Sequence, residues 1–93
     1  MKNKIILTTA IALISTVLFA QTPKAYITNF GDSFISVVDI QKNQKIADIK
    51  TGSKPHGSAV SPDGKWVAVS NEGDNSVSII STANNTVTQT VSV

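Results

Sequence analysis

The sequence predicts an all-β fold of short antiparallel strands that follows an export signal. Three observations predict it. Apolar and polar residues alternate in short stretches from residue 24 onward, turn residues separate these stretches, and the pattern of the first half recurs 42 residues later. No stretch beyond residue 24 keeps a helical period, and Val, Ile and Thr dominate the alternating segments, as is typical of strands.

The N-terminal residues predict a secretory signal peptide. A short cationic start precedes an apolar run over 5–20 that contains no charged residue, Gly or Pro. This run is shorter than the roughly 20 residues that cross a bilayer. We therefore predict cleavage after Ala20, with 1–20 as the signal peptide and no stable membrane span in the mature chain. Leu18 is larger than the residue typical of a cleavage site, which leaves an uncleaved anchor as the alternative.

Charge and cysteine content exclude several function classes for residues 21–93. This segment carries six lysines, six acidic residues and no Arg, so it is formally neutral and lacks the basic footprint of a nucleic-acid binder. The chain contains no Cys, which excludes disulfides, thiolate metal sites and covalently attached c-type haem. We expect an exported protein of the periplasm or cell surface, with a protein or small molecule as its partner.

The first three strands are predicted over 24–29 (KAYITN), 34–39 (FISVVD) and 45–50 (KIADIK). Residues 30–33 form the first turn, because Gly, Asp and Ser favour turns. The polar connection 41–44 separates the second strand from the third. This part of the sequence therefore indicates a meander of three antiparallel strands.

Four more strands are predicted over 57–61, 66–71, 76–81 and 86–93. The segment Ser61-Pro62-Asp63-Gly64 turns between the first two of them. Proline sets the φ that the second turn position needs, and glycine accepts the sterically awkward exit. The second half of the chain is therefore a second antiparallel meander.

The two meanders are copies of one unit. With a shift of 42 residues, apolar positions coincide, as Ile35 does with Val77 and Ile49 with Val91. The same shift superposes Asn29 on Asn71, Gly31 on Gly73, Asp32 on Asp74, Ser36 on Ser78, and Asn43 on Asn85. A repeat of about 40 to 50 residues with four short strands predicts blades of a β-propeller, because one such sheet cannot bury both of its faces alone.

Specific segments resemble the YVTN-type β-propeller repeat. They are Tyr26-Ile27-Thr28-Asn29, Ile35-Ser36-Val37-Val38-Asp39, Gly52-Ser53-Lys54-Pro55-His56-Gly57 and Ala59-Val60-Ser61-Pro62-Asp63-Gly64-Lys65. The second repeat departs from the family pattern, with Ala68-Val69-Ser70-Asn71 in place of the first segment. The resemblance implies a bacterial exported or cell-surface protein. It also implies that the strand starting at Gly57 is the innermost of its blade.

The predicted propeller is incomplete. Residues 21–93 would form a partial first blade over 24–52 and a second blade over 53–93, whereas propellers close with about 4 to 8 blades. We therefore expect the chain to be the N-terminal part of a larger propeller. Closure of a ring by several copies is the alternative, and exposed blade edges would in either case favour self-association.

His56 and Lys54 are the candidate ligand-binding residues. In an antiparallel meander successive connections lie at opposite ends of the sheet, so Lys54 and His56 should share one end with the turns 30–33 and 72–75. In a closed propeller this end of the innermost strand borders the central channel. Some propellers with similar repeats bind a d-type haem through a blade histidine, but a structural hydrogen bond to the neighbouring blade is the simpler role for His56. We assign no catalytic residue, metal ligand or cofactor.

Two further groups of side chains have alternative interpretations. One group has the composition of a calcium-binding loop but lacks the spacing of an EF-hand, so we expect its members to cap turns: Asn29, Asp32, Asn71, Glu72 and Asp74. The other group is aromatic and could stack on a ligand, but we expect its members to pack between blades: Tyr26, Phe30, Phe34 and Trp66.

The sequence favours an exported binding or scaffold module whose ligand is unknown. The alternative is a fragment of a propeller enzyme or redox subunit, similar to a lactonase or to a reductase with a d-type haem. No Gly-x-Ser-x-Gly motif occurs and His56 is the single histidine, so the chain by itself is expected to have no catalytic activity.

Overall fold

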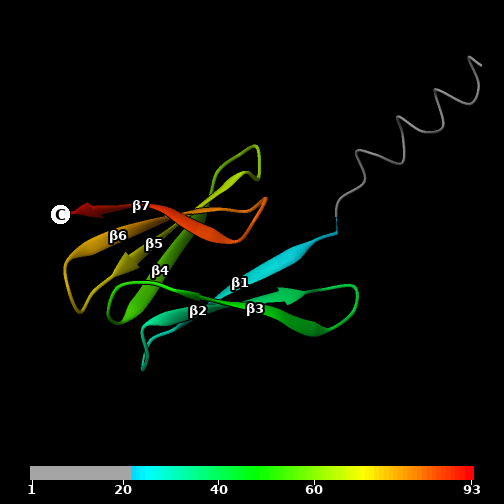
Figure 1. The fold of residues 1–93 in the computed structure, drawn as a ribbon, viewed down its shortest axis with the longest axis horizontal. Helices are drawn as coiled ribbons and strands as arrows, with labels where there is room; N and C mark the ends of the chain where they lie inside the picture. Colours follow the sequence, from blue (N-terminus) through cyan, green and yellow to red (C-terminus); the bar gives the residue numbers. More distant parts are fainter. Residues whose placement is uncertain (1–21) are drawn as a thin grey trace, which may run out of the picture.

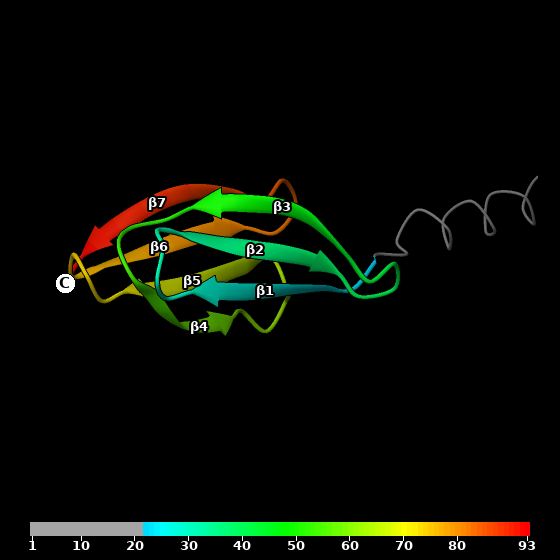
Figure 2. The same cartoon turned by 90° about the horizontal axis from the view of Figure 1, so that it is seen from below.

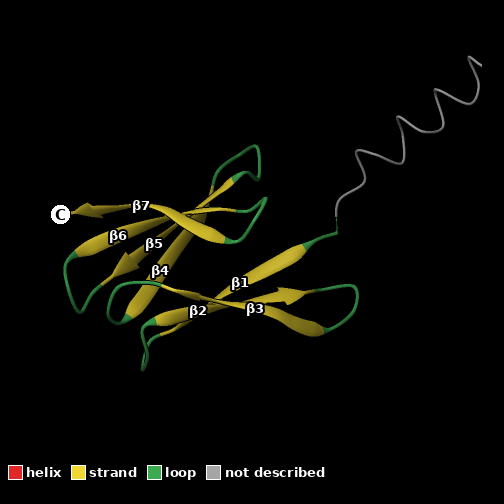
Figure 3. Ribbon diagram, viewed as in Figure 1, coloured by secondary structure: helices red, strands yellow, loops and turns green. Residues whose placement is uncertain are grey.

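A computed structural model describes residues 22–93, and the predicted signal peptide lies outside them. These residues form two antiparallel sheets with strand orders β1-β2-β3 and β4-β5-β6-β7 (Figure 1). Strands and loops account for all of the described residues (Figure 3), and none of these residues belongs to a helix able to cross a membrane. The predicted fold class, all-β with incomplete propeller blades, is confirmed. The strands are β1 (Lys24–Asn29), β2 (Phe34–Asp39), β3 (Gln44–Lys50), β4 (Pro55–Val60), β5 (Trp66–Asn71), β6 (Ser76–Ser81) and β7 (Thr86–Ser92).

The hydrophobic core lies between the two sheets, which stack face to face as neighbouring blades (Figure 2). Strand alternation sends every second side chain toward the other sheet. In β2 and β3 these side chains include Ile35, Val37 and Ile49, and in the second sheet Val67, Val69 and Ile80 face them. All six are buried, so removal of apolar surface from water holds the blades together.

The sequence repeat is also a repeat of backbone geometry. A β-bulge interrupts the pairing at Val37/Val38 in the first sheet and at Ile79/Ile80 in the second. Asn43 and Asn85 both adopt a φ of 55° in the turns that precede the outermost strands. Asparagine tolerates this left-handed conformation better than most residues with a side chain, which explains why it recurs there.

An asparagine at the end of β1 and another at the end of β5 each bond the side chain of the next strand. Asn29 Nδ2 donates to Ser36 Oγ at 3.2 Å, and Asn71 Nδ2 donates to Ser78 Oγ at 3.0 Å. The residue that follows the last strand of each sheet makes the same backbone hydrogen bond. Thr51 N, after β3, donates to Ser33 O, and Val93 N, after β7, donates to Asn75 O, each at 2.9 Å.

The innermost strand differs from the predicted one. The sequence predicts a strand over 57–61, whereas β4 begins at Pro55 and ends at Val60. A register shift between Pro55 and Ser58 marks a bulge, where Ser70 Oγ accepts from Gly57 N at 3.0 Å. Because a bulge breaks the alternation of side chains on which the prediction depends, the sequence pattern does not place Pro55 and His56 in the strand. At the outer strands the differences are one residue each, since β3 starts at Gln44 and β7 ends at Ser92.

Candidate functional site

The connector between the sheets brings Lys54 to the end where turns of both blades meet. Lys54 N donates to Asp32 O at 3.2 Å, in the β1–β2 turn of the first sheet. Glu72 N donates to Lys54 O at 3.0 Å, and Gly73 N donates to Ser53 O at 2.9 Å, in the β5–β6 turn of the second sheet. The shared end that alternation predicts for these segments is therefore present, with the connector bonded to both turns.

Lys54 is held in an unusual backbone conformation. Its φ is 53°, in the left-handed region that costs a residue with a side chain roughly 1 to 2 kcal/mol. The two backbone hydrogen bonds that Lys54 makes, to Asp32 and Glu72, offset this cost. The left-handed residue turns the chain sharply into Pro55, and the lysine side chain remains exposed to solvent.

His56 follows at the bulge of β4 and contacts both turns. Its Nδ1 lies 3.0 Å from Glu72 Oε2, and its ring meets the ring of Phe30 edge-on, with centroids 5.3 Å apart. The side chains of His56 and Glu72 are 66% and 53% exposed, so their pairing contributes at most about 1 kcal/mol to stability. The contacts thus orient the imidazole through one nitrogen and one ring edge, and they leave Nε2 available.

Glu72 is the site residue that the sequence analysis missed. It was grouped with the turn-capping residues, although the repeat contains a signal that distinguishes it. A shift of 42 residues superposes Glu72 on Phe30, so the repeat changes residue type at the position that faces His56. Both of these residues contact the histidine, one from each blade.

The other turn acid of the second blade behaves as predicted. Asp74 Oδ1 accepts from Ser76 Oγ at 2.6 Å, and Asp74 Oδ2 accepts from Ser53 N at 3.0 Å. The hydrogen bond from Ser76, together with the bond from the Ser53 backbone, lowers the pKa of the Asp74 carboxyl. Asp74 therefore caps its turn as a carboxylate and fastens the connector to the second blade.

Among the four aromatic residues expected to pack between blades, Tyr26 lies against the core and Phe30 contacts His56 of the other blade, whereas Phe34 and Trp66 do not belong to the core between the two described sheets. Tyr26 packs against the core between the blades. Trp66 and Phe30 are 44% and 49% exposed, and Phe34 is half-buried outside that core. Trp66 precedes the buried Val67 and therefore points to the opposite face of its sheet, where no other described strand covers it.

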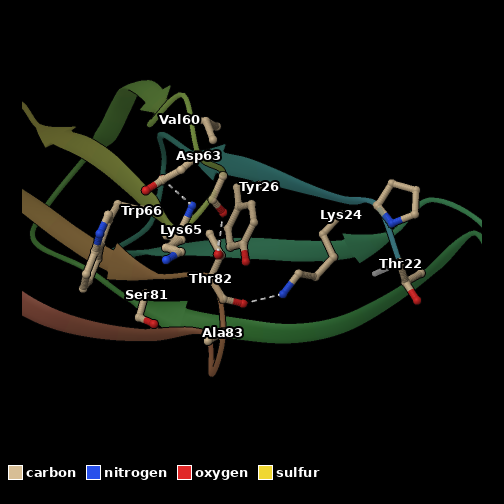
Figure 4. Close-up of a pocket in the computed structure, with 12 residues that line it drawn as sticks. Thr22, Lys24, Tyr26, Val60, Asp63, Lys65, Trp66, Ser81, Thr82 and Ala83 are labelled. Carbon is tan, nitrogen blue, oxygen red and sulfur yellow. Dashed lines mark hydrogen bonds between the residues drawn. The ribbon is translucent and has the colours of Figure 1, made fainter. Parts of the chain in front are cut away.

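A cleft of about 930 Å³ lies at the opposite end of the sheets (Figure 4). There the Lys24 ammonium donates to Thr82 O at 2.6 Å, and Tyr26 Oη donates to Asn85 Oδ1 at 2.6 Å. These bonds tie β1 to the β6–β7 turn, so the polar groups on this side of the cleft stabilise the blade pair. The cleft is lined by Thr22, Pro23, Lys24, Tyr26, Val60, Asp63, Gly64, Lys65, Trp66, Ser81, Thr82 and Ala83.

Comparisons with known proteins identify what the chain is similar to. The model of the cytochrome D1 heme domain family matches residues 1–93. A solved structure of hydrazine synthase from Kuenenia stuttgartiensis is 36% identical, with a TM-score of 0.70 over 72% of this chain. The match covers 20% of the hydrazine synthase chain, so the similarity concerns a small part of that protein. A search of curated proteins found no significant match.

Proposed function

Because this chain belongs to the cytochrome d1 haem domain family, we propose that it forms blades of a propeller that binds a d-type haem, with His56 as the residue that ligates the iron. The observation that carries the proposal is the position of the histidine. His56 is oriented through Nδ1 by a carboxylate 3.0 Å away, and it lies on β4, the edge strand of its sheet, which would border the channel if the propeller closed.

The donor set fits a haem. Histidines that bind metals typically direct their second ring nitrogen to a carboxylate or a carbonyl, which orients the ring and makes the ligating nitrogen more basic. Glu72 is placed to do this for His56, and Nε2 is the nitrogen that histidine commonly offers to a metal. When bound, the haem supplies an iron centre able to exchange electrons.

Each neighbouring side chain has a separate task in this proposal. Glu72 positions His56 by holding Nδ1, while the edge of Phe30 restricts rotation of the imidazole from the other blade. Lys54 places a positive charge two residues before His56, which favours the carboxylate substituents of a tetrapyrrole. The chain contains no Arg that could serve this purpose.

The proposal combines the binding and redox interpretations of the sequence. The chain would act as a ligand-binding part of a larger redox protein. From the N-terminal residues we expect export to the periplasm or cell surface. The YVTN-type character of the repeat also stays a prediction. Hydrazine synthase is the name of the similar protein, and we do not propose that activity for this chain.

The proposal is tested by titrating the chain with ferric haem as the probe and recording absorption spectra. The unmodified chain should bind one haem with the spectrum of histidine ligation. His56→Ala should lose that spectrum while keeping its circular dichroism, because the side chain is exposed and contributes little to folding. Retention of an unchanged haem spectrum by this variant would show that His56 is not the ligand.

Glu72→Gln separates a positioning role from a structural one. The variant should still bind haem, but its midpoint potential should rise, because a neutral amide polarises the imidazole less than a carboxylate does. Asp48→Asn is the matched control, since Asp48 is an exposed carboxylate on β3, paired with Lys45 at 3.0 Å and not with His56. Equal potentials for the unmodified chain and Glu72→Gln would contradict the role of Glu72.

A further inference from the structure

We infer that the bond between Asp63 and Gly64 is a site of isoaspartate formation, and that the hydrogen bonds of its turn restrain the reaction. Asp63-Gly64 is the one Asp-Gly pair of the sequence, and it lies in the turn between β4 and β5, with both residues exposed. Glycine after aspartate favours this reaction, because no side chain shields the attacking nitrogen. The inference concerns this turn and does not depend on haem binding.

The reaction needs no partner other than water. The backbone nitrogen of Gly64 loses its proton and attacks Cγ of the Asp63 carboxyl, so that a C–N bond forms and a water molecule leaves to give a cyclic succinimide. Water then adds to one carbonyl of the ring and breaks its C–N bond. One direction of opening restores aspartate. The other leaves Gly64 joined to Cγ, so the backbone gains a methylene and the former main-chain carbonyl becomes the free carboxylate.

Two hydrogen bonds hold the Asp63 carboxylate in the folded turn. Asp63 Oδ1 accepts from Ser61 Oγ at 2.6 Å and from Lys65 N at 3.0 Å. The bond from Ser61, together with the bond from the Lys65 backbone, lowers the pKa of the Asp63 carboxyl. A carboxylate reacts with a nitrogen nucleophile more slowly than a neutral carboxylic acid does, because its charge repels the attacking electron pair. These bonds therefore keep Asp63 in its less reactive form.

The nitrogen that attacks is held by the same turn. Gly64 N donates to Ser61 O at 2.9 Å, the hydrogen bond that closes a four-residue β-turn. This bond engages the proton that the nitrogen must lose before it attacks. Trp66 N in turn donates to Ser61 Oγ at 3.0 Å. Ser61 thus binds both reacting groups, the carboxylate through its hydroxyl and the nitrogen through its carbonyl.

The turn depends on these hydrogen bonds and not on packing. Gly64 has a φ of 72°, and a Cβ built on it would meet nothing within 4 Å, so the space beside the glycine is open. Exposed segments with few packed side chains open locally without unfolding of the whole chain. Isoaspartate formation should therefore follow opening of this turn. Once it has formed, the carboxyl carbon of Asp63 belongs to the backbone, so the bonds to Ser61 and Lys65 cannot form again.

The test compares the full chain with a synthetic peptide of residues 59–66, AVSPDGKW, in mildly acidic buffer. Chromatography and mass spectrometry of the digested chain separate isoaspartate from aspartate at Asp63. The full chain should form isoaspartate at least about tenfold more slowly than the peptide, which corresponds to about 1.4 kcal/mol for opening of the turn. Equal rates would show that the turn does not restrain the reaction. Absence of isoaspartate from the full chain after complete conversion of the peptide would overturn the assignment of the site.

Ser61→Ala tests the restraint directly, because it removes the hydroxyl that donates to Asp63 and keeps the backbone. Isoaspartate should form about fivefold faster in this variant, as expected for the loss of one hydrogen bond. Ser36→Ala is the matched control, since Ser36 Oγ donates at 3.1 Å to Asp48, a carboxylate outside this turn. Circular dichroism verifies that both variants are folded. An unchanged rate in Ser61→Ala, or the same acceleration in Ser36→Ala, would refute the inference.

Discussion

At the scale of single residues, hydrogen bonds determine which charged groups stabilise the fold. Asp74 is exposed, yet it accepts from Ser76 Oγ and from Ser53 N, and these bonds favour its charged form. Its pKa is therefore lower in the folded chain than in the unfolded chain. The resulting stabilisation is present at pH values above the unfolded pKa, and it is lost as the pH falls through the folded pKa.

We predict that Asp74→Asn removes this pH dependence. The variant should melt at a lower temperature than the unmodified chain at neutral pH, and the difference should shrink in the acid range, where the carboxyl of the unmodified chain is protonated. Asp32→Asn is the control, because its carboxylate lies at the equivalent position without a bond to the connector. A difference that stays constant with pH would show that the Asp74 charge does not contribute.

At the scale of secondary-structure elements, polar bonds at the cleft hold β1 to the β6–β7 turn. Tyr26 Oη donates to Asn85 Oδ1 at 2.6 Å, and Asn85 lies in the turn with a φ of 55°. Lys24 adds a bond to Thr82 O at 2.6 Å. Both donors come from β1 and both acceptors from the turn, so these bonds fix the orientation of one blade on the other.

We predict that Tyr26→Phe lowers the free energy of unfolding by about 1 kcal/mol, the usual net contribution of one hydrogen bond. Phenylalanine keeps the ring in the core, so the loss isolates the hydroxyl. Trp66→Phe is the control, since Trp66 is 44% exposed at the same cleft and should change stability little. Urea unfolding measures both, and equal stability of Tyr26→Phe and the unmodified chain would show that the bond to Asn85 contributes nothing.

At the scale of the whole molecule, the two sheets bury equivalent residues to different extents. Ile49 and Val91 occupy the same position of the repeat, but Ile49 is 5% exposed and Val91 is 40% exposed. Ile49 faces the second sheet, whereas no described sheet covers the corresponding face of the second blade. Each blade thus has two packing faces, and the described pair covers one face of each.

We predict that Ile49→Ala lowers the free energy of unfolding by about 2 to 5 kcal/mol, as truncation of a buried aliphatic side chain usually does. Val91→Ala should cost less than about 1 kcal/mol, because the half-exposed side chain leaves no closed cavity. Denaturant unfolding of the two variants provides the comparison. Similar losses at both positions would mean that Val91 is covered in solution.

Most of the fold could be predicted from the sequence because it depends on local patterns. Period-two alternation identifies six of the seven strands within one residue at each end, as for the strand predicted over 45–50 and found at Gln44–Lys50. The start of β4 could not be predicted, since the bulge at Gly57 depends on a hydroxyl thirteen residues away, on Ser70. The predicted positions of His56 and Lys54 followed from strand direction alone.

The strands, the turns and the repetition of the unit can be predicted from the amino-acid sequence, because each depends on residues close together in the chain. Which copy of a repeated residue is buried or hydrogen-bonded follows from the packing of the two sheets and cannot be predicted in this way. The Asp74 carboxylate accepts from Ser53 N of the connector, whereas no such bond is found for the carboxylate of Asp32 at the equivalent position; likewise Val69 is buried and the equivalent Ile27 is half-exposed. A repeat makes two units chemically alike, but burial depends on what lies next to each unit, and the sequence of one unit does not contain that information.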